Sequence, residues 1–297
     1  MRIRGINPIA VGIGLALLVG LDVRSEKTPE IAAQFEQAQA YLRGTGVERD
    51  AAKAFELFRA AAERGDVRAQ SNVGSMLLNG QGVPKDEAEG ARWVKRAAEQ
   101  GAMLAQFSYA LLLSRGQGIA RDEEEAREWF RKAAEQGHVD SAAHLGHLYF
   151  HGEGGADRDH GRAANYLRMA AEGGVAEAQN TLGFMYEMGM GVDVQLETAA
   201  KWFRAAAEQG HARAQVNLGQ LYASGAGVQG DVVEAYRWVK IGAMQGEVSG
   251  EKMLEDVTPR LSEEELAEAE RRVAKFRKEF RERASANQTQ LTSQSQP

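Results

Sequence analysis

The stretch LGQLYASGAGVQGDVVEAYRWVKIGAMQG, Leu218–Gly246, decides the fold because its pattern recurs along most of the chain. Its G-x-G turn has counterparts at intervals of 36 or 37 residues, beginning at Gly44, Gly80, Gly116, Gly152, Gly189 and Gly225. A single glycine closes each copy, at Gly65, Gly101, Gly137, Gly174, Gly210 and Gly246. The one extra residue falls in the loop GEGGAD, residues 152–157, where an insertion leaves packed elements undisturbed.

Each copy is predicted to form two helices, because apolar residues recur at helical spacing before and after the G-x-G turn. Glycine ends the first helix, where it adopts positive φ at little cost. A column of aspartates precedes the second helix, as N-caps do: Asp50, Asp86, Asp122, Asp159 and Asp231. Gln195 replaces aspartate in the fifth copy, where we expect no strong cap. Large side chains share one core column: Leu57, Trp93, Trp129, Tyr166, Trp202 and Trp238.

The combined pattern A-x-x-x-L-G-x-x-Y-x-x-G-x-G-V and D-x-x-x-A-x-x-W-x-x-x-A-A-x-x-G resembles the Sel-one-like repeat, a relative of the tetratricopeptide repeat. Six copies cover about 31–66, 67–102, 103–138, 139–174, 175–210 and 211–246, with a partial seventh at 247–257. The first copy departs from the pattern at Ala38 and Leu57. The resemblance implies an all-α fold, a right-handed α/α solenoid that serves as a platform for protein partners, in bacteria often secreted or in the envelope.

The solenoid is expected to span residues 28–257 and to be closed at its C-terminal end by a helix within 258–283. The seventh copy breaks at Thr258-Pro259, and Ser262 with Glu265 forms a capping box. The apolar stripe of this capping helix should cover the last repeat: Leu266, Ala269, Val273, Phe276 and Phe280. The polar tail 284–297 is low in complexity and is expected to be disordered.

Residues 1–27 form a separate segment, in which Arg2 and Arg4 precede the apolar run Ile9–Leu21. That run is short for a membrane span and typical of a signal-peptide core. No A-x-A cleavage site follows it, so two alternatives remain, a cleaved signal peptide or an N-terminal membrane anchor through residues 9–21. Both alternatives place the repeats outside the cytoplasm, so the protein is expected to be periplasmic, secreted or anchored at the inner membrane. A buried or frayed helix is the structural alternative.

Composition excludes several kinds of chemistry. The chain has no cysteine, which removes disulfides, thiolate zinc sites, cysteine nucleophiles and lipoprotein processing. The formal net charge is −6 and no basic face stands out, so we expect no nucleic-acid partner. No cofactor motif is present, because the G-x-G turns follow helices and recur in every copy.

Three histidines share one face of a predicted first helix, His144, His147 and His151. They are weak candidates for a metal site, since Asp140, His160 or a neighbouring repeat would have to complete the ligand set. A variable, solvent-facing surface is the reading we favour. A metal-responsive binding protein remains an alternative.

Ser249 and Lys252 match the S-x-x-K motif of serine acylases. Some cysteine-rich members of the resembling family have been linked to β-lactam binding, so an envelope hydrolase or β-lactam-binding protein is the second alternative. The chain has neither S-D-N nor K-T-G, and it has no cysteine, so we predict that it is not an enzyme.

The expected working surface is the variable face of the first helices, which line the concave groove in the resembling solenoids. Its predicted partner-binding residues are Asn72, Phe107, Leu111, Arg115, His147, His151, Phe184, Met188, Val216, Asn217 and Gln220. The alternative is that some of them pack against the adjacent repeat. The prediction is a non-enzymatic scaffold of the cell envelope that binds a peptide or protein of unknown identity in this groove.

Overall fold

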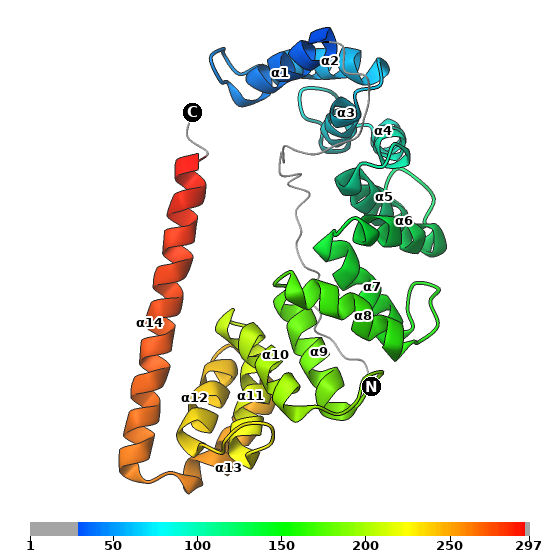
Figure 1. Ribbon diagram of the computed structural model, residues 1–297. Coiled ribbons are helices and arrows are strands. Elements are labelled where there is room, and N and C mark those ends of the chain that lie inside the picture. The colour runs from blue at the N-terminus through cyan, green and yellow to red at the C-terminus, as the bar shows by residue number, and fades with distance from the viewer. Residues whose placement is uncertain (1–28, 295–297) are drawn as a thin grey trace. The chain divides into compact units, whose positions relative to one another are not determined.

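A computed structural model of the chain describes residues 29–294, and these residues form helices without any strand (Figure 1). The first helices of the repeats are α1 (Pro29–Arg43), α3 (Val67–Asn79), α5 (Met103–Arg115), α7 (Val139–His151), α9 (Ala176–Met188) and α11 (Ala212–Ser224). The second helices are α2 (Ala51–Glu63), α4 (Glu87–Glu99), α6 (Glu123–Glu135), α8 (His160–Glu172), α10 (Leu196–Glu208) and α12 (Val232–Ala243). The predicted all-α architecture of six helix pairs is confirmed.

The chain divides into two compact units, each with its own core. The described part of unit 1 comprises residues 29–105 and 117–119, and that of unit 2 comprises 106–116 and 120–294. In unit 1, Phe35 and Phe58 meet edge to face, with their ring centroids 5.4 Å apart, beside the buried Trp93. In unit 2, Phe203 and Trp238 belong to one apolar cluster.

The two helices of a repeat approach closely at a glycine of the first helix. A Cβ atom on Gly183 of α9 would lie 2.8 Å from Cδ1 of Phe203 on α10, and one on Gly219 would lie 2.5 Å from Cγ2 of Val239. A side chain at these positions would therefore force the helix pair apart.

The second glycine of each G-x-G turn makes another close approach. A Cβ atom on Gly191, where φ is +70°, would lie 2.3 Å from the backbone of His160 at the start of the preceding second helix. Gly82 and Gly227 lie in the same way against Ala51 and Leu196. The turn thus serves two purposes, since it ends one helix and packs on the previous repeat.

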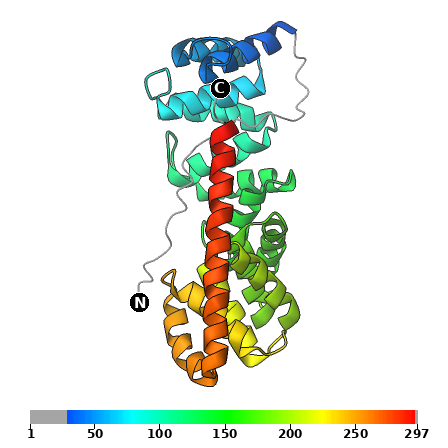
Figure 2. The same ribbon diagram turned by 90° about the vertical axis from the view of Figure 1, so that its left-hand side faces the viewer.

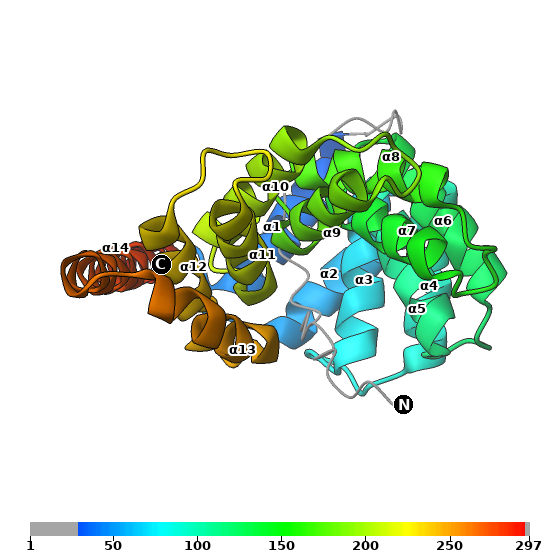
Figure 3. The same ribbon diagram turned by 90° about the horizontal axis from the view of Figure 1, so that it is seen from below.

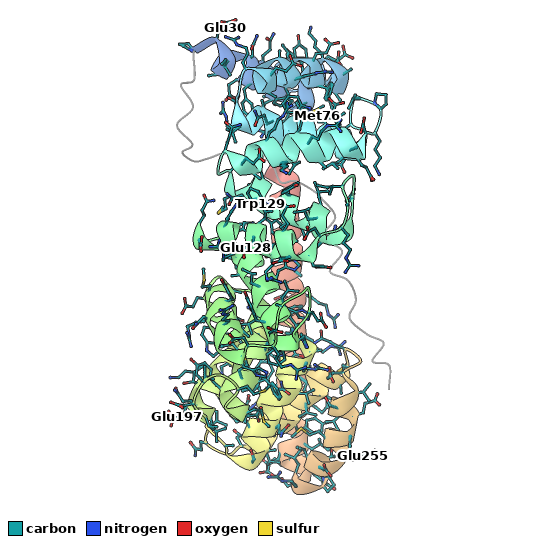
Figure 4. All side chains as sticks on the ribbon, turned by 90° about the vertical axis from the view of Figure 1, so that its right-hand side faces the viewer. Glu30, Met76, Glu128, Trp129, Glu197 and Glu255 are labelled. Carbon is teal, nitrogen blue, oxygen red and sulfur yellow. The ribbon has the colours of Figure 1, made fainter. Side chains whose placement is uncertain are left out.

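The second helices begin where the aspartate column predicts. Asp86 accepts a hydrogen bond from the backbone N–H of Glu89 at 2.8 Å, and Asp159 accepts one from Arg162 at 2.9 Å. The side chain of Gln195 makes no capping hydrogen bond at the start of α10, as expected. Side chains exposed on the outside of the helices include Glu30, Glu197 and Glu255, whereas Met76 is buried (Figure 4).

Glutamine pairs tie the two helices of a repeat to each other and to the preceding repeat, a feature that the sequence analysis missed. The glutamine on the first helix of each pair is buried. Gln209 at the end of α10 donates from Nε2 to Oε1 of Gln179 on α9 at 2.7 Å. Gln179 in turn donates to the carbonyl of Ala171 at 3.0 Å, which ties α9 to the end of α8. The other pairs within one unit have the same length of 2.7 Å: Gln100 with Gln70, Gln136 with Gln106, and Gln245 with Gln215.

The C-terminal end departs from the repeat as predicted. After α13 (Val248–Val257) and a short 3₁₀ helix, η1 (Thr258–Arg260), the long helix α14 (Glu263–Gln294) begins at the capping box. There Glu265 accepts from the backbone N–H of Ser262 at 2.9 Å. Figures 1 and 3 show α14 beside α12, and Figure 2 shows it as one continuous helix.

The stripe on α14 has the expected contacts with α12. Val273 is buried, and the ring of Phe276 lies 5.3 Å from that of Trp238. Tyr236 donates its hydroxyl proton to Glu270 at 2.6 Å. One expectation was wrong, because α14 continues to Gln294 and makes residues 284–294 helical instead of disordered. A polar sequence can extend a helix that tertiary contacts have already nucleated.

The predicted signal peptide or anchor, residues 1–27, lies outside the described residues. Within residues 29–294, no helix combines the length and the apolar character that crossing a membrane requires.

Candidate partner-binding surface

The predicted partner-binding residues are divided between the two units. Asn72 lies on α3 in unit 1. All the others lie in unit 2, on α5, α7, α9 and α11.

An exposed apolar pair lies on α9, at the centre of the predicted stripe. Phe184 keeps 37% of its surface exposed and Met188 keeps 58%. They are separated by one helical turn and therefore lie on one face. Their neighbour Met185 is fully buried, so α9 presents two apolar faces, one packed and one open.

Two other apolar members of the stripe belong to the core. Val216 is 3% exposed, and its Cγ2 atom lies 2.7 Å from where a Cβ atom on Gly242 would stand. Leu111 is 9% exposed. For these two residues the alternative of packing within the repeats is correct, and neither presents an open side chain to a partner. The contacts of the individual repeat decide this, because Leu111 occupies the same repeat position as the exposed Phe184.

The predicted asparagines already have partners within the chain. Asn217 on α11 donates from Nδ2 to Oδ1 of Asn180 on α9 at 3.1 Å, and Asn180 is buried. Asn72 donates to the carbonyl of Arg68 at 2.8 Å, one turn earlier on the same helix. Gln220 and Arg115 are exposed, and Phe107 is half-buried.

The three histidines do not converge. The rings of His147 and His151 lie 4.3 Å apart, and Nδ1 of His147 is 3.9 Å from a carboxylate oxygen of Glu153. The ring of His144 instead stacks on Phe130 at 4.9 Å. Desolvation lowers the pKa of His144 and of His151, which favours the neutral rings. Within residues 29–294, no three His, Cys, Asp or Glu side chains are grouped as metal ligands require.

A hydrogen bond that the sequence analysis missed borders the same face. Glu177 on α9 and Nε2 of His211, which precedes α11, are 2.8 Å apart. The hydrogen bond from His211 lowers the pKa of Glu177. The signal was present in the sequence, because Asp140, Glu177 and Arg213 occupy one column of the repeat and all three are charged.

Ser249 has none of the surroundings of an acylating serine. Its hydroxyl donates to Glu247 at 2.8 Å, and both Ser249 and Lys252 are exposed on the surface of α13. Neither side chain hydrogen-bonds to the other, so Lys252 is not positioned as a base for Ser249.

Each unit has a cleft that involves its second helices. One of about 530 Å³ is formed between α12 and α14 and is lined by Glu234, Arg237, Glu268, Arg271, Arg272, Lys275, Phe276 and Glu279. The other, of about 260 Å³, lies between α2 and α4 and is lined by Arg59, Glu63, Glu89, Arg92, Trp93 and Arg96. Both are rich in charged side chains, unlike the open face of α9.

Helix pairs that pack in series through a glycine column, a G-x-G turn and a glutamine link define an α/α repeat protein. The Sel1 repeat model matches residues 31–66, 67–101, 104–138, 139–175, 176–211 and 212–247. The chain therefore belongs to the Sel1 repeat family, as its resemblance in sequence implied. Sel1 repeats commonly mediate protein–protein interactions.

A solved structure agrees with this assignment. A Sel1 repeat protein from Oxalobacter formigenes is 33% identical over 76% of this chain and 65% of that chain, with a TM-score of 0.61. The chain thus spans about two thirds of that protein's length. The protein c5321, a protective antigen of uropathogenic Escherichia coli with an SLR fold, is 27% identical over 88% of this chain and 71% of that chain, with a TM-score of 0.42. No curated protein matched the chain.

Proposed function

We propose that the chain is a non-enzymatic scaffold that binds a peptide or protein segment over the first-helix face of unit 2. The observation that carries this proposal is the open apolar face of α9, where Phe184 and Met188 lie exposed beside the polar residues of α7 and α11. Both side chains stay exposed in the folded repeat, and the fourth repeat holds polar His147 and His151 at the same positions.

The chemistry of the face indicates the kind of segment that it accepts. Burial of Phe184 and Met188 by apolar side chains of a partner would supply most of the binding free energy, because exposed apolar anchors dominate such interfaces. Exposed Gln220 on one side, and the pair of His147 and His151 on the other, offer hydrogen-bonding groups at the rim. An amphipathic segment with a central apolar residue meets both requirements.

Cellular location is part of the same proposal. Arg2, Arg4 and the apolar run Ile9–Leu21 support a scaffold that works outside the cytoplasm. A C-terminal fusion to a phosphatase that is active only outside the cytoplasm should be active, and it should lose activity when residues 1–27 are removed. An inactive fusion of the full chain would contradict this location.

The binding face is tested by placing a photoreactive residue at Phe184 and capturing partners in the cells that make the protein. Met169 on α8 is the matched control, because its exposed fraction, 39%, is close to the 37% of Phe184 but it lies on a second helix. A defined protein captured from position 184 and not from position 169 is the expected result.

The captured protein is then purified and titrated. Replacing Phe184 and Met188 with alanine should weaken its binding by about a hundredfold, the loss of two anchors at an interface centre. Met169→Ala should leave the affinity unchanged. Equal capture at both positions, or equal affinity of the two variants, would show that the face of α9 is not the binding surface.

A further inference from the structure

The cleft between α2 and α4 repeats the residues of the surface that α14 covers. At the same repeat positions, α10 and α12 carry Arg204, Glu208, Glu234, Arg237, Trp238 and Ile241. Of these, Glu234, Arg237 and Trp238 contact α14. The α2/α4 groove contains Arg59, Glu63, Glu89, Arg92, Trp93 and Arg96. Five of the six positions are identical, and only Arg96 and Ile241 differ.

This agreement is more than the general repeat pattern. Arg59 and Glu63 do belong to common columns, but the glutamate, arginine and tryptophan of the second helix do not recur elsewhere. On three other second helices, the same three positions hold different combinations: Glu125, Glu128 and Trp129 on α6, Arg162, Asn165 and Tyr166 on α8, and Thr198, Lys201 and Trp202 on α10. Only α4 and α12 therefore combine an acidic residue, an arginine and a tryptophan in this order.

In unit 2 the structure shows how a helix uses this set. Nη1 of Arg272 on α14 lies 2.8 Å from a carboxylate oxygen of Glu234, which also pairs with Arg237 at 3.0 Å. Four residues later on α14, the ring of Phe276 packs on Trp238. The guanidinium of Arg237 lies 5.7 Å from the centre of the Phe276 ring. Arg272 and Phe276 of α14 therefore contact all three residues of α12: Glu234, Arg237 and Trp238.

In unit 1 the same groups lack these partners. Glu89 accepts a hydrogen bond from Nε1 of Trp93 at 3.3 Å, but no cation pairs with it within the described residues. Arg92, the counterpart of Arg237, has no ion pair within that part of the chain either. The guanidinium of Arg96 lies 4.5 Å from the centre of the Trp93 ring. Trp93 is the counterpart of Trp238, on which Phe276 packs in unit 2.

We propose that the α2/α4 groove binds a helix of a partner protein that carries an arginine and, four residues later, an aromatic residue. The arginine pairs with Glu89, and the aromatic ring displaces Arg96 from Trp93. Desolvating such a charged pair under an aromatic cover strengthens it relative to an exposed pair. This surface lies on second helices and is separate from the proposed face of α9, so either can hold without the other.

The probe is a synthetic peptide of residues 262–286, which contains Arg272 and Phe276 and stabilises its own helix through Glu-Arg pairs such as Glu268 and Arg272. The peptide, carrying a fluorophore, is titrated into the full-length protein and followed by anisotropy. A second version carries a photoreactive residue in place of Phe276, and the cross-linked site is mapped by mass spectrometry.

The expected result is cross-linking to α2 or α4 and an affinity that depends on the groove. Arg96→Ile removes the side chain that covers Trp93 and should tighten binding about tenfold. Glu89→Arg should weaken it by a similar factor, whereas Glu125→Arg, at the same repeat position on α6, should have no effect. Circular dichroism of each variant checks that the helical fold is kept.

Three results would overturn the proposal. The first is no binding of the peptide, and the second is cross-linking confined to α10 and α12, which would mean that the peptide only exchanges with α14. The third is self-association of the protein without peptide that Glu89→Arg abolishes, because a second copy would then be the occupant of the groove.

Discussion

The fourth and fifth repeats lie side by side in unit 2 and solve the same packing problem with different residues. The fifth repeat, α9 and α10, has the glutamine pair Gln179 and Gln209. The fourth, α7 and α8, has Ala142 and Gly173 at these positions and so lacks the pair. Both keep the close helix approach, through Gly183 and Gly146. Helix contact is therefore the shared requirement, and the polar link is an addition that a repeat can lose.

The two repeats differ more on the face that packing leaves open. Where the fifth repeat exposes Phe184 and Met188, the fourth presents His147 and His151. The columns that face the neighbouring helix remain apolar in both, at Leu145 and Leu182. The difference indicates that the residues at buried repeat positions specify the fold. The residues at exposed positions can differ between repeats to suit what each repeat contacts.

The largest expected effect comes from filling the helix contact. Gly183→Leu places a side chain where even a Cβ atom would lie 2.8 Å from Phe203, so we expect a loss of about 3 kcal/mol or more in unfolding free energy. Gly161→Leu is the control, since a Cβ atom there meets nothing nearer than Asp159 at 3.4 Å. Urea denaturation measures both. Equal stability of the two variants would mean that the glycine contact is not the shared requirement.

An intermediate effect is expected from breaking the glutamine link of the fifth repeat. Gln179→Ala removes the amide that donates to the buried carbonyl of Ala171 and the oxygen that accepts from Gln209, which should destabilise the protein by about 1–3 kcal/mol. Gln220→Ala, an exposed position on α11, is the matched control and should change stability by less than about 0.5 kcal/mol. If Gln179→Ala behaves like the control, the link does not stabilise the fifth repeat relative to the fourth, which lacks it.

Sequence predicted the repeats, their helix boundaries and the caps well, because these depend on local spacing. The positions of Asp86, Gly189 and Ser262 could be interpreted without knowing what packs around them. The glutamine link escaped prediction because it joins residues of different helices, Gln179 and Gln209, and because its geometry depends on how repeats stack. The length of α14 escaped for a related reason, since packing on α12 nucleates a helix that its polar end would not form alone.

The candidate surface was predicted less well than the fold. Phe184 and Met188 are exposed as the stripe requires, but Val216, on the corresponding stripe of α11, is buried. One column is buried in one repeat and open in another, as Leu111 and Phe184 show, and hydrophobic periodicity alone does not predict which. The pairing of Asn217 with Asn180 likewise depends on the distance between neighbouring first helices, which the sequence does not state.

The smallest effect concerns how the first helices of the two repeats begin. His138 caps α7, and its Nδ1 atom accepts from the backbone N–H of Ser141 at 3.2 Å, whereas Val175 gives α9 no side-chain cap. A protonated ring cannot accept this bond, and burial lowers the pKa of His138 below its usual 6.5. The unfolded chain therefore binds more protons, so this residue's contribution to stability is present above pH 6.5 and is lost as the pH falls below it.

His138→Asn keeps a neutral cap acceptor that does not titrate, so the variant should lose less stability than the natural protein between pH 7 and pH 5. Urea denaturation at a series of pH values measures the two slopes. His144 and His151 are present in both proteins, and a charge on His138 lowers the pKa of His144 as well. Parallel slopes would mean that His138 binds protons equally in the folded and unfolded states, so that the cap and the burial do not lower its pKa. A shallower slope in the variant would mean that α7 of the fourth repeat begins at a pH-sensitive N-cap. The fifth repeat, which has Val175 at this position, has no such cap.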